Sequence, residues 1–187
     1  MKITAKSIQE QKGSGKPITC LTAYDFPTAA LLDEIRIDIV LVGDSLGTVL
    51  LGYDSTCPVT MRDMLHHTKA VSRAVKYSLV VSDMPFGSYE SSPEKAIRNA
   101  QRLIKEGGAS SVKLEGGKRM AKTVASLVQK SIPVMGHVGL TPQSAESLGG
   151  TWRMSPARST APASIQSASL PCSIRAATSS ARRPEPS

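Results

Sequence analysis

Short apolar runs alternate with amphipathic stretches along most of the chain, from residue 17 to about residue 140. Five runs have the length of buried strands and lie at residues 17–24, 37–45, 78–86, 110–117 and 131–140. Four stretches with the spacing of a helix face lie between them, at residues 26–36, 60–75, 92–108 and 117–130. This order is typical of parallel βαβ units with right-handed crossovers. We therefore predict an α/β fold with five strands.

Start and stop signals support the predicted helices. Thr60 precedes a helical stretch with Asp63 three residues later, which is the spacing of a capping box. Ser92 is followed by a proline, which suits the first position of a helix. Glycines at positions 107 and 108 then provide a stop signal.

The alternation ends after Gln143. Residues 144–187 contain 11 Ser, 8 Ala, 5 Pro and 5 Arg, with no Lys and no Asp. Such a segment buries too little apolar area to offset its ordering entropy. It is either a functional disordered tail or a frameshifted C-terminus, and we favour the second because this composition is typical of a GC-rich gene read out of frame. We predict an α/β unit over 1–143 and an irregular tail over 144–187.

Composition excludes several classes of function. The formal charge is +8, but residues 1–143 carry 18 Lys/Arg against 13 Asp/Glu and show no basic stripe interleaved with aromatic residues, so we expect no nucleic-acid partner. The three cysteines are far apart and form no CxxC motif, which suits a cytoplasmic location. No long apolar run is present, so we expect no membrane partner.

Acidic residues follow three successive predicted strands. Asp44, Asp83 and Glu115 lie at the carboxyl ends of the runs 37–45, 78–86 and 110–117, where α/β folds carry their sites. Each residue alone has a turn or helix-cap interpretation. Three carboxylates at one rim repel one another unless a cation neutralises them, and hard oxygen ligands favour Mg²⁺. We therefore predict a divalent-metal site.

Three neighbouring polar residues each have two possible roles. Lys113 precedes Glu115 by two residues and shares its face of the strand, so it balances carboxylate charge or binds an anionic substrate. His137 ends the fifth strand and is either a buried hydrogen-bonded histidine or a donor to a substrate oxygen. Ser45 either caps the loop or contacts a ligand, and Gly43 and Gly47 around it permit close approach of a ligand to the backbone.

Several stretches resemble one known family in order and spacing. They are ITCLTAYDFPTA, VLVGDSLGTVLLGYDST, PVTMRDMLHHTKAV, VVSDMPFGSY, VKLEGG and PVMGHVGLTPQS. They resemble ketopantoate hydroxymethyltransferase over residues 3–144. The resemblance implies a (β/α)₈ TIM barrel, of which residues 1–143 are the N-terminal part with about the first five βα units. It also implies a cytoplasmic homo-oligomeric enzyme of pantothenate synthesis.

The resemblance also implies the reaction. A hydroxymethyl group passes from 5,10-methylenetetrahydrofolate to C3 of 3-methyl-2-oxobutanoate, a 2-oxoacid, with one Mg²⁺ per subunit. By the resemblance, the metal ligands are Asp44, Asp83 and Glu115. The implied substrate-binding residues are Asp44, Ser45, Asp83, Lys113 and His137.

The sequence departs from the family at one catalytic position. The family's proton-accepting glutamate lies on the next strand, in a segment resembling IVLEC, and only Glu146 and Glu185 are acidic after Glu115. We therefore expect this chain to contain no counterpart of that catalytic residue. Two alternatives to the transferase follow: an inactive remnant of it, and a related metal-dependent 2-oxoacid lyase on the same barrel.

Overall fold

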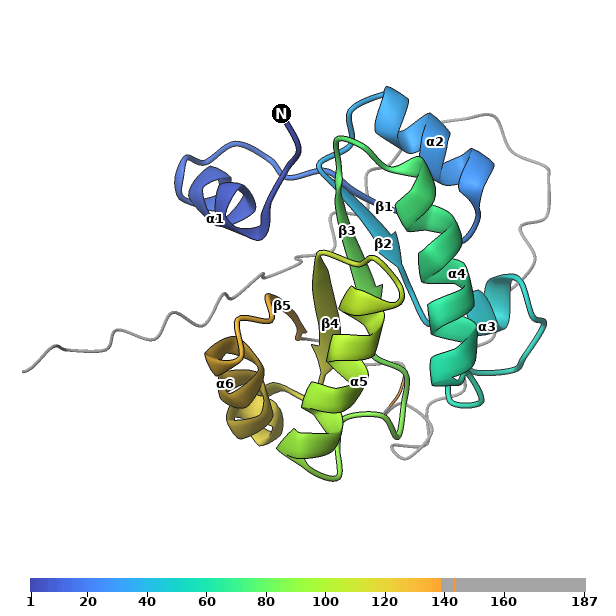
Figure 1. Cartoon of the computed structure of the whole chain (residues 1–187), viewed down its shortest axis with the longest axis vertical. Helices are drawn as coiled ribbons and strands as arrows, with labels where there is room; N and C mark the ends of the chain where they lie inside the picture. The colour runs from blue at the N-terminus through green and yellow to red at the C-terminus, as the bar shows by residue number, and fades with distance from the viewer. Residues whose placement is uncertain (139–142, 144–187) are drawn as a thin grey trace, which may run out of the picture.

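The computed structural model describes residues 1–138 and residue 143, and its centre is a five-stranded parallel sheet (Figure 1). The strands are β1 (Cys20–Thr22), β2 (Ile39–Val42), β3 (Leu79–Asp83), β4 (Ser111–Glu115) and β5 (Val134–His137). Each strand pairs with the next one along the chain, in the order β1-β2-β3-β4-β5. All five predicted strands are confirmed, each shorter than the apolar run that contains it.

The four predicted helices are present. They are α2 (Phe26–Glu34), α4 (Met61–Ala74), α5 (Pro93–Lys105) and α6 (Ala121–Gln129), the last preceded by the 3₁₀ turn η1 (Gly117–Met120). Thr60 and Asp63 form the predicted capping box, and the Ser92 side chain accepts a hydrogen bond from the backbone N–H of Lys95. The helix boundaries therefore follow the local capping chemistry.

Two helices were not predicted. The first, α1 (Ala5–Gly13), buries only Ile8, so its sequence carries almost no apolar periodicity. The second, α3 (Leu46–Val49), is a single turn directly after the end of β2. Neither helix has the apolar stripe by which a helix is detected in a sequence.

The two faces of the sheet have different partners. Helices α2, α4, α5 and α6 cover one face, where they bury residues such as Val40, Val80, Val112 and Leu114 (Figure 1). In a doubly wound sheet the strand order reverses and helices cover both faces. Sequential strand order with the helices on one side is instead the arrangement of a (β/α)₈ barrel.

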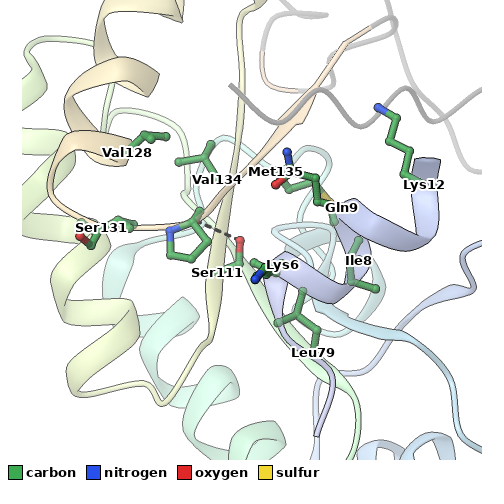
Figure 2. A pocket seen from close by; sticks show the side chains of 13 residues that line it. Lys6, Ile8, Gln9, Lys12, Leu79, Ser111, Val128, Ser131, Val134 and Met135 are labelled. Atoms are coloured by element: carbon green, nitrogen blue, oxygen red, sulfur yellow. Dashed lines mark hydrogen bonds between the residues drawn. The ribbon is translucent and has the colours of Figure 1, made fainter. Parts of the chain in front are cut away.

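The opposite face carries a separate apolar cluster. It contains Ile39, Leu79, Val81 and Met135 from the strands and Ile8 from α1. Beside it lies a cavity of about 300 Å³ between α1 and the amino ends of β3, β4 and β5 (Figure 2). This cavity is at the end of the sheet away from the predicted carboxylate rim.

The part of the chain that the structure describes contains no helix long and apolar enough to cross a membrane. The irregular tail predicted for residues 144–187 lies outside the described residues. The predicted boundary at residue 143 therefore stays a prediction.

Candidate active site

The carboxyl ends of β2, β3 and β4 bring three buried carboxylates to one rim. Asp44 follows β2 by two residues, whereas Asp83 and Glu115 are the last residues of β3 and β4. Their exposed fractions are 5%, 4% and 4%. Asp25, at the end of the β1 segment, behaves differently, because its carboxylate caps α2 by accepting from the N–H of Thr28.

Lys113 is paired with Asp83 across the sheet. The two residues are register partners in β3 and β4, so their side chains share a face of the sheet, and Lys113 Nζ donates to Asp83 Oδ1 at 2.5 Å. Burial alone would lower the pKa of Lys113, but the negative charge of Asp83 outweighs burial and raises it. Lys113 is therefore a positive charge fixed among the carboxylates.

His137 and Glu115 form the next pair. They are register partners in β5 and β4, and His137 Nδ1 lies 2.8 Å from Glu115 Oε1. The His137 side chain is 28% exposed, whereas that of Glu115 is 4% exposed. The histidine thus lies between a buried carboxylate and the solvent side of the rim.

The surroundings of Asp44 perturb its carboxyl group. Burial and the charge of Asp83 raise the pKa of Asp44 to about 6, although a hydrogen bond from Gln143 and the charge of Lys113 act in the opposite direction. The backbone N–H of Asp44 also donates to Asp83 Oδ2 at 3.1 Å. The rim therefore holds more negative charge than Lys113 alone compensates.

Ser45 contacts another side chain rather than capping a helix. It occupies the N-cap position of α3 without a side-chain capping bond. Its Oγ lies 2.8 Å from the hydroxyl of Tyr24, which follows β1. A Cβ on Gly43 would lie 2.7 Å from Ser45 Oγ, and a Cβ on Gly47 would lie 2.5 Å from a Val59 methyl. Packing thus requires a glycine at position 47, whereas a side chain at position 43 would displace the Ser45 hydroxyl.

Gln143 is a rim residue that the sequence did not single out. Its side-chain Nε2 donates to Asp44 Oδ2 at 2.7 Å, and its backbone N–H donates to Glu115 Oε2 at 3.2 Å. The hydroxyl of Tyr89 donates to Gln143 Oε1 at 2.6 Å. Sequence patterns indicate little about Gln143 for two reasons. It lies beyond β5, away from any strand end, and an amide side chain is not typical of one kind of catalytic or metal site.

The donor set at the rim suits a hard cation. Buried carboxylate oxygens in excess over positive charge are the ligands that Mg²⁺ prefers. Within residues 1–138 and 143, however, no three His, Cys, Asp or Glu side chains are grouped as the ligands of one ion would be. Asp44, Asp83 and Glu115 thus offer the donor atoms that Mg²⁺ prefers, but in this structure their oxygens are held in hydrogen bonds with Gln143, Lys113 and His137.

A second cavity opens beside the rim. It measures about 240 Å³, which is slightly below the usual range for small-molecule sites. Its lining residues come from the loops after β3 and β4 together with Gln143: Phe86, Tyr89, Glu90, Glu115, Gly116, Arg119, Met120 and Gln143. A ligand in this cavity would lie against the carboxylate of Glu115. The larger cavity beside α1 contains none of these residues.

Comparison with known sequences gives one consistent family. A family model described as ketopantoate hydroxymethyltransferase matches residues 2–170. The chain is 60% identical over 149 residues to 3-methyl-2-oxobutanoate hydroxymethyltransferases of Thermoanaerobacter sp. (strain X514) and Heliobacterium modesticaldum (strain ATCC 51547 / Ice1). Each alignment covers 80% of the chain and 54% of the relative. The chain thus spans about half the length of the curated relatives it matches.

Solved structures show the fold. A phosphonopyruvate hydrolase in complex with oxalate and Mg²⁺ matches with a TM-score of 0.59 at 13% identity, over 79% of this chain and 55% of that one. A 2,3-dimethylmalate lyase of the PEP mutase/isocitrate lyase superfamily matches with a TM-score of 0.54 at 15% identity, over 73% and 51%. The predicted fold class, an α/β fold of the TIM-barrel type, is confirmed.

Proposed function

The chain belongs to the ketopantoate hydroxymethyltransferase family, a family of transferases, and from that membership we propose that its carboxylate rim binds 3-methyl-2-oxobutanoate. The reaction proposed is transfer of a hydroxymethyl group from 5,10-methylenetetrahydrofolate to C3 of this 2-oxoacid, which gives 2-dehydropantoate for pantothenate and coenzyme A synthesis. The curated relatives, which are named for this activity, support the proposal.

One observation carries the metal part of the proposal. Asp44, Asp83 and Glu115 are all at most 5% exposed, and Lys113 is the cation hydrogen-bonded among them. Buried like charges are costly unless a cation balances them. We propose that these three residues hold one Mg²⁺ per subunit. When bound, the ion would polarise the substrate oxygens and so acidify the C3–H bond.

The remaining rim residues have roles toward the 2-oxoacid. Lys113 supplies a fixed positive charge for the oxygens on which negative charge develops. Ser45 and His137 offer a hydroxyl group and a ring nitrogen at the same rim. A fold neighbour in complex with oxalate and Mg²⁺ supports this assignment, because oxalate, like a 2-oxoacid, presents adjacent oxygens that chelate a metal.

The proposed partners are other copies of this chain and the two small-molecule substrates. Large apolar side chains are exposed on and around α2 and α3. They are Phe26, Leu31, Ile35, Val49, Leu50, Leu51 and Tyr53. They lie in two short segments of the chain, and exposed apolar side chains that gather into a patch are typical of protein–protein contacts. We propose a homo-oligomer in the cytoplasm.

The ability to remove a proton from C3 of the 2-oxoacid distinguishes an active enzyme from an inactive remnant. We expect the 187-residue chain to form no detectable 2-dehydropantoate from 3-methyl-2-oxobutanoate, methylenetetrahydrofolate and Mg²⁺. The reason is that the resemblance places the proton-accepting glutamate in a segment like IVLEC, and no such segment follows Glu115 in this sequence. Product formation is measured by mass spectrometry, with the Thermoanaerobacter relative as positive control. Turnover by this chain would show that another residue accepts the proton and would rule out the remnant.

A further inference from the structure

Gln143 is almost fully buried and uses every polar group that it has. Its exposed fraction is 5%. Its Nε2 donates to Asp44 Oδ2 at 2.7 Å and to the backbone oxygen of Met84 at 3.1 Å. Its backbone N–H donates to Glu115 Oε2, and its backbone oxygen accepts from Cys57 Sγ at 3.8 Å. One residue is thus bonded to segments after β2, after β3 and at the end of β4.

Tyr89 fixes the orientation of the Gln143 amide. The hydroxyl of Tyr89 accepts the backbone N–H of Glu115 at 3.2 Å, so its own proton is available for Gln143 Oε1 at 2.6 Å. Because the amide oxygen faces Tyr89, the amide nitrogen must face Asp44. The Glu115 N–H thus determines the direction of the hydrogen bond from Tyr89 to Gln143. That bond in turn determines the direction of the hydrogen bond from Gln143 to Asp44.

The network restrains two of the three rim carboxylates. Gln143 holds one oxygen of Asp44 through its side chain and one oxygen of Glu115 through its backbone. A carboxylate with one oxygen held in this way loses rotational freedom, and its remaining lone pairs keep a defined direction. The two donors also offset part of the repulsion between the two negative charges.

We propose that Gln143 is a positioning residue that orients Asp44 and Glu115 toward a divalent cation. The inference rests on the proposed metal site and adds a residue to it that acts through the ligands rather than on the metal. Residues in this position, one layer outside the ligands, typically change metal affinity by about 10–100-fold when they are replaced. Gln143 is close to Met in shape, so Gln143→Met removes the hydrogen bonds of the side chain while conserving its volume.

The test is the affinity of the full chain for Mn²⁺ alone, measured by electron paramagnetic resonance of the free ion at a temperature where circular dichroism shows each variant folded. We expect Gln143→Met to raise the Mn²⁺ dissociation constant by about 10–100-fold. Gln129→Met, at an exposed position of α6, is the matched control and should leave the constant unchanged. Tyr89→Phe removes the donor to the Gln143 amide and also the acceptor of the Glu115 N–H, and it should likewise raise the constant.

Three results contradict the inference in distinguishable ways. Absence of Mn²⁺ binding by the wild-type chain would overturn the metal site and the role of Gln143 together. Wild-type binding with unchanged affinity in Gln143→Met would overturn the role of Gln143 alone. If Gln143→Met does not fold, unchanged affinity in Tyr89→Phe has the same meaning.

Discussion

Lys113→Met is expected to lower the free energy of unfolding by about 3–5 kcal/mol at pH 7, as is typical when one partner of a buried ion pair is removed. The Lys113 and Asp83 side chains are 14% and 5% exposed, so water cannot replace the lost partner. The substitution leaves Asp83 beside Asp44 without the compensating charge. A loss of this size is a large fraction of the 5–15 kcal/mol typical of a whole domain. Urea unfolding followed by circular dichroism measures it.

A double-mutant cycle separates this electrostatic cost from simple repacking. Asp83→Asn in the Lys113→Met background should restore part of the lost stability, because the unpaired charge is then absent. Lys122→Met, at an exposed position of α6, should change stability by less than about 0.5 kcal/mol. Additive losses in the double variant would show that Lys113 does not stabilise the rim through Asp83.

The stability of the wild-type chain is expected to fall relative to Asp44→Asn as the pH rises from about 4 to about 7. The pKa of Asp44 is raised from 3.8 to about 6 by burial and by the charge of Asp83. Between these values the folded chain retains a proton that the unfolded chain has released, so stability from this group is present at low pH and is lost as the pH rises through about 6. A shift of about two pKa units corresponds to about 3 kcal/mol.

Urea unfolding at several pH values, in the presence of a chelator, measures this difference. Asn at position 44 retains an oxygen that can accept a hydrogen bond from Gln143, but it cannot ionise. The contributions of other titrating groups to the free energy of unfolding therefore cancel when the two chains are compared. Asp54→Asn, at an exposed position, should show no such pH-dependent difference from wild type. A wild-type chain that gains stability relative to Asp44→Asn over this range would refute the assignment of a raised pKa.

The second prediction describes a carboxylate that lowers the stability of the fold. Asp44 ionises in a buried position next to another carboxylate, which a stable core would avoid. A sequence that breaks a packing rule at one place usually does so at a functional site. The cost at Asp44 is therefore part of the argument that the rim binds a cation.

Much of the site could be predicted because strand ends are local features. The apolar runs place Asp44, Asp83 and Glu115 at their ends, and parallel pairing brings those ends to one rim. The spacing of Lys113 and Glu115 places both on one face of β4. The register that makes Lys113 the partner of Asp83, however, depends on how β3 aligns with β4, and no short stretch of sequence determines that alignment.

Other features of the site depend on tertiary contacts. Gln143 is bonded to Asp44, which lies 99 residues earlier in the chain, and nothing near Gln143 in the sequence predicts that contact. The hydroxyl pair of Tyr24 and Ser45 joins the ends of two strands in the same way. Helix α1 was missed because only Ile8 of its nine residues is buried.

The most direct test of the central claim is calorimetric titration of the full chain with 3-methyl-2-oxobutanoate, with Mg²⁺ present and with Mg²⁺ removed by a chelator. If Asp44, Asp83 and Glu115 hold a cation that the 2-oxoacid chelates, binding requires Mg²⁺ and is lost in Asp44→Asn. Equal affinity with and without Mg²⁺, or unchanged affinity in Asp44→Asn, would contradict the proposal that the carboxylate rim binds the substrate through a metal.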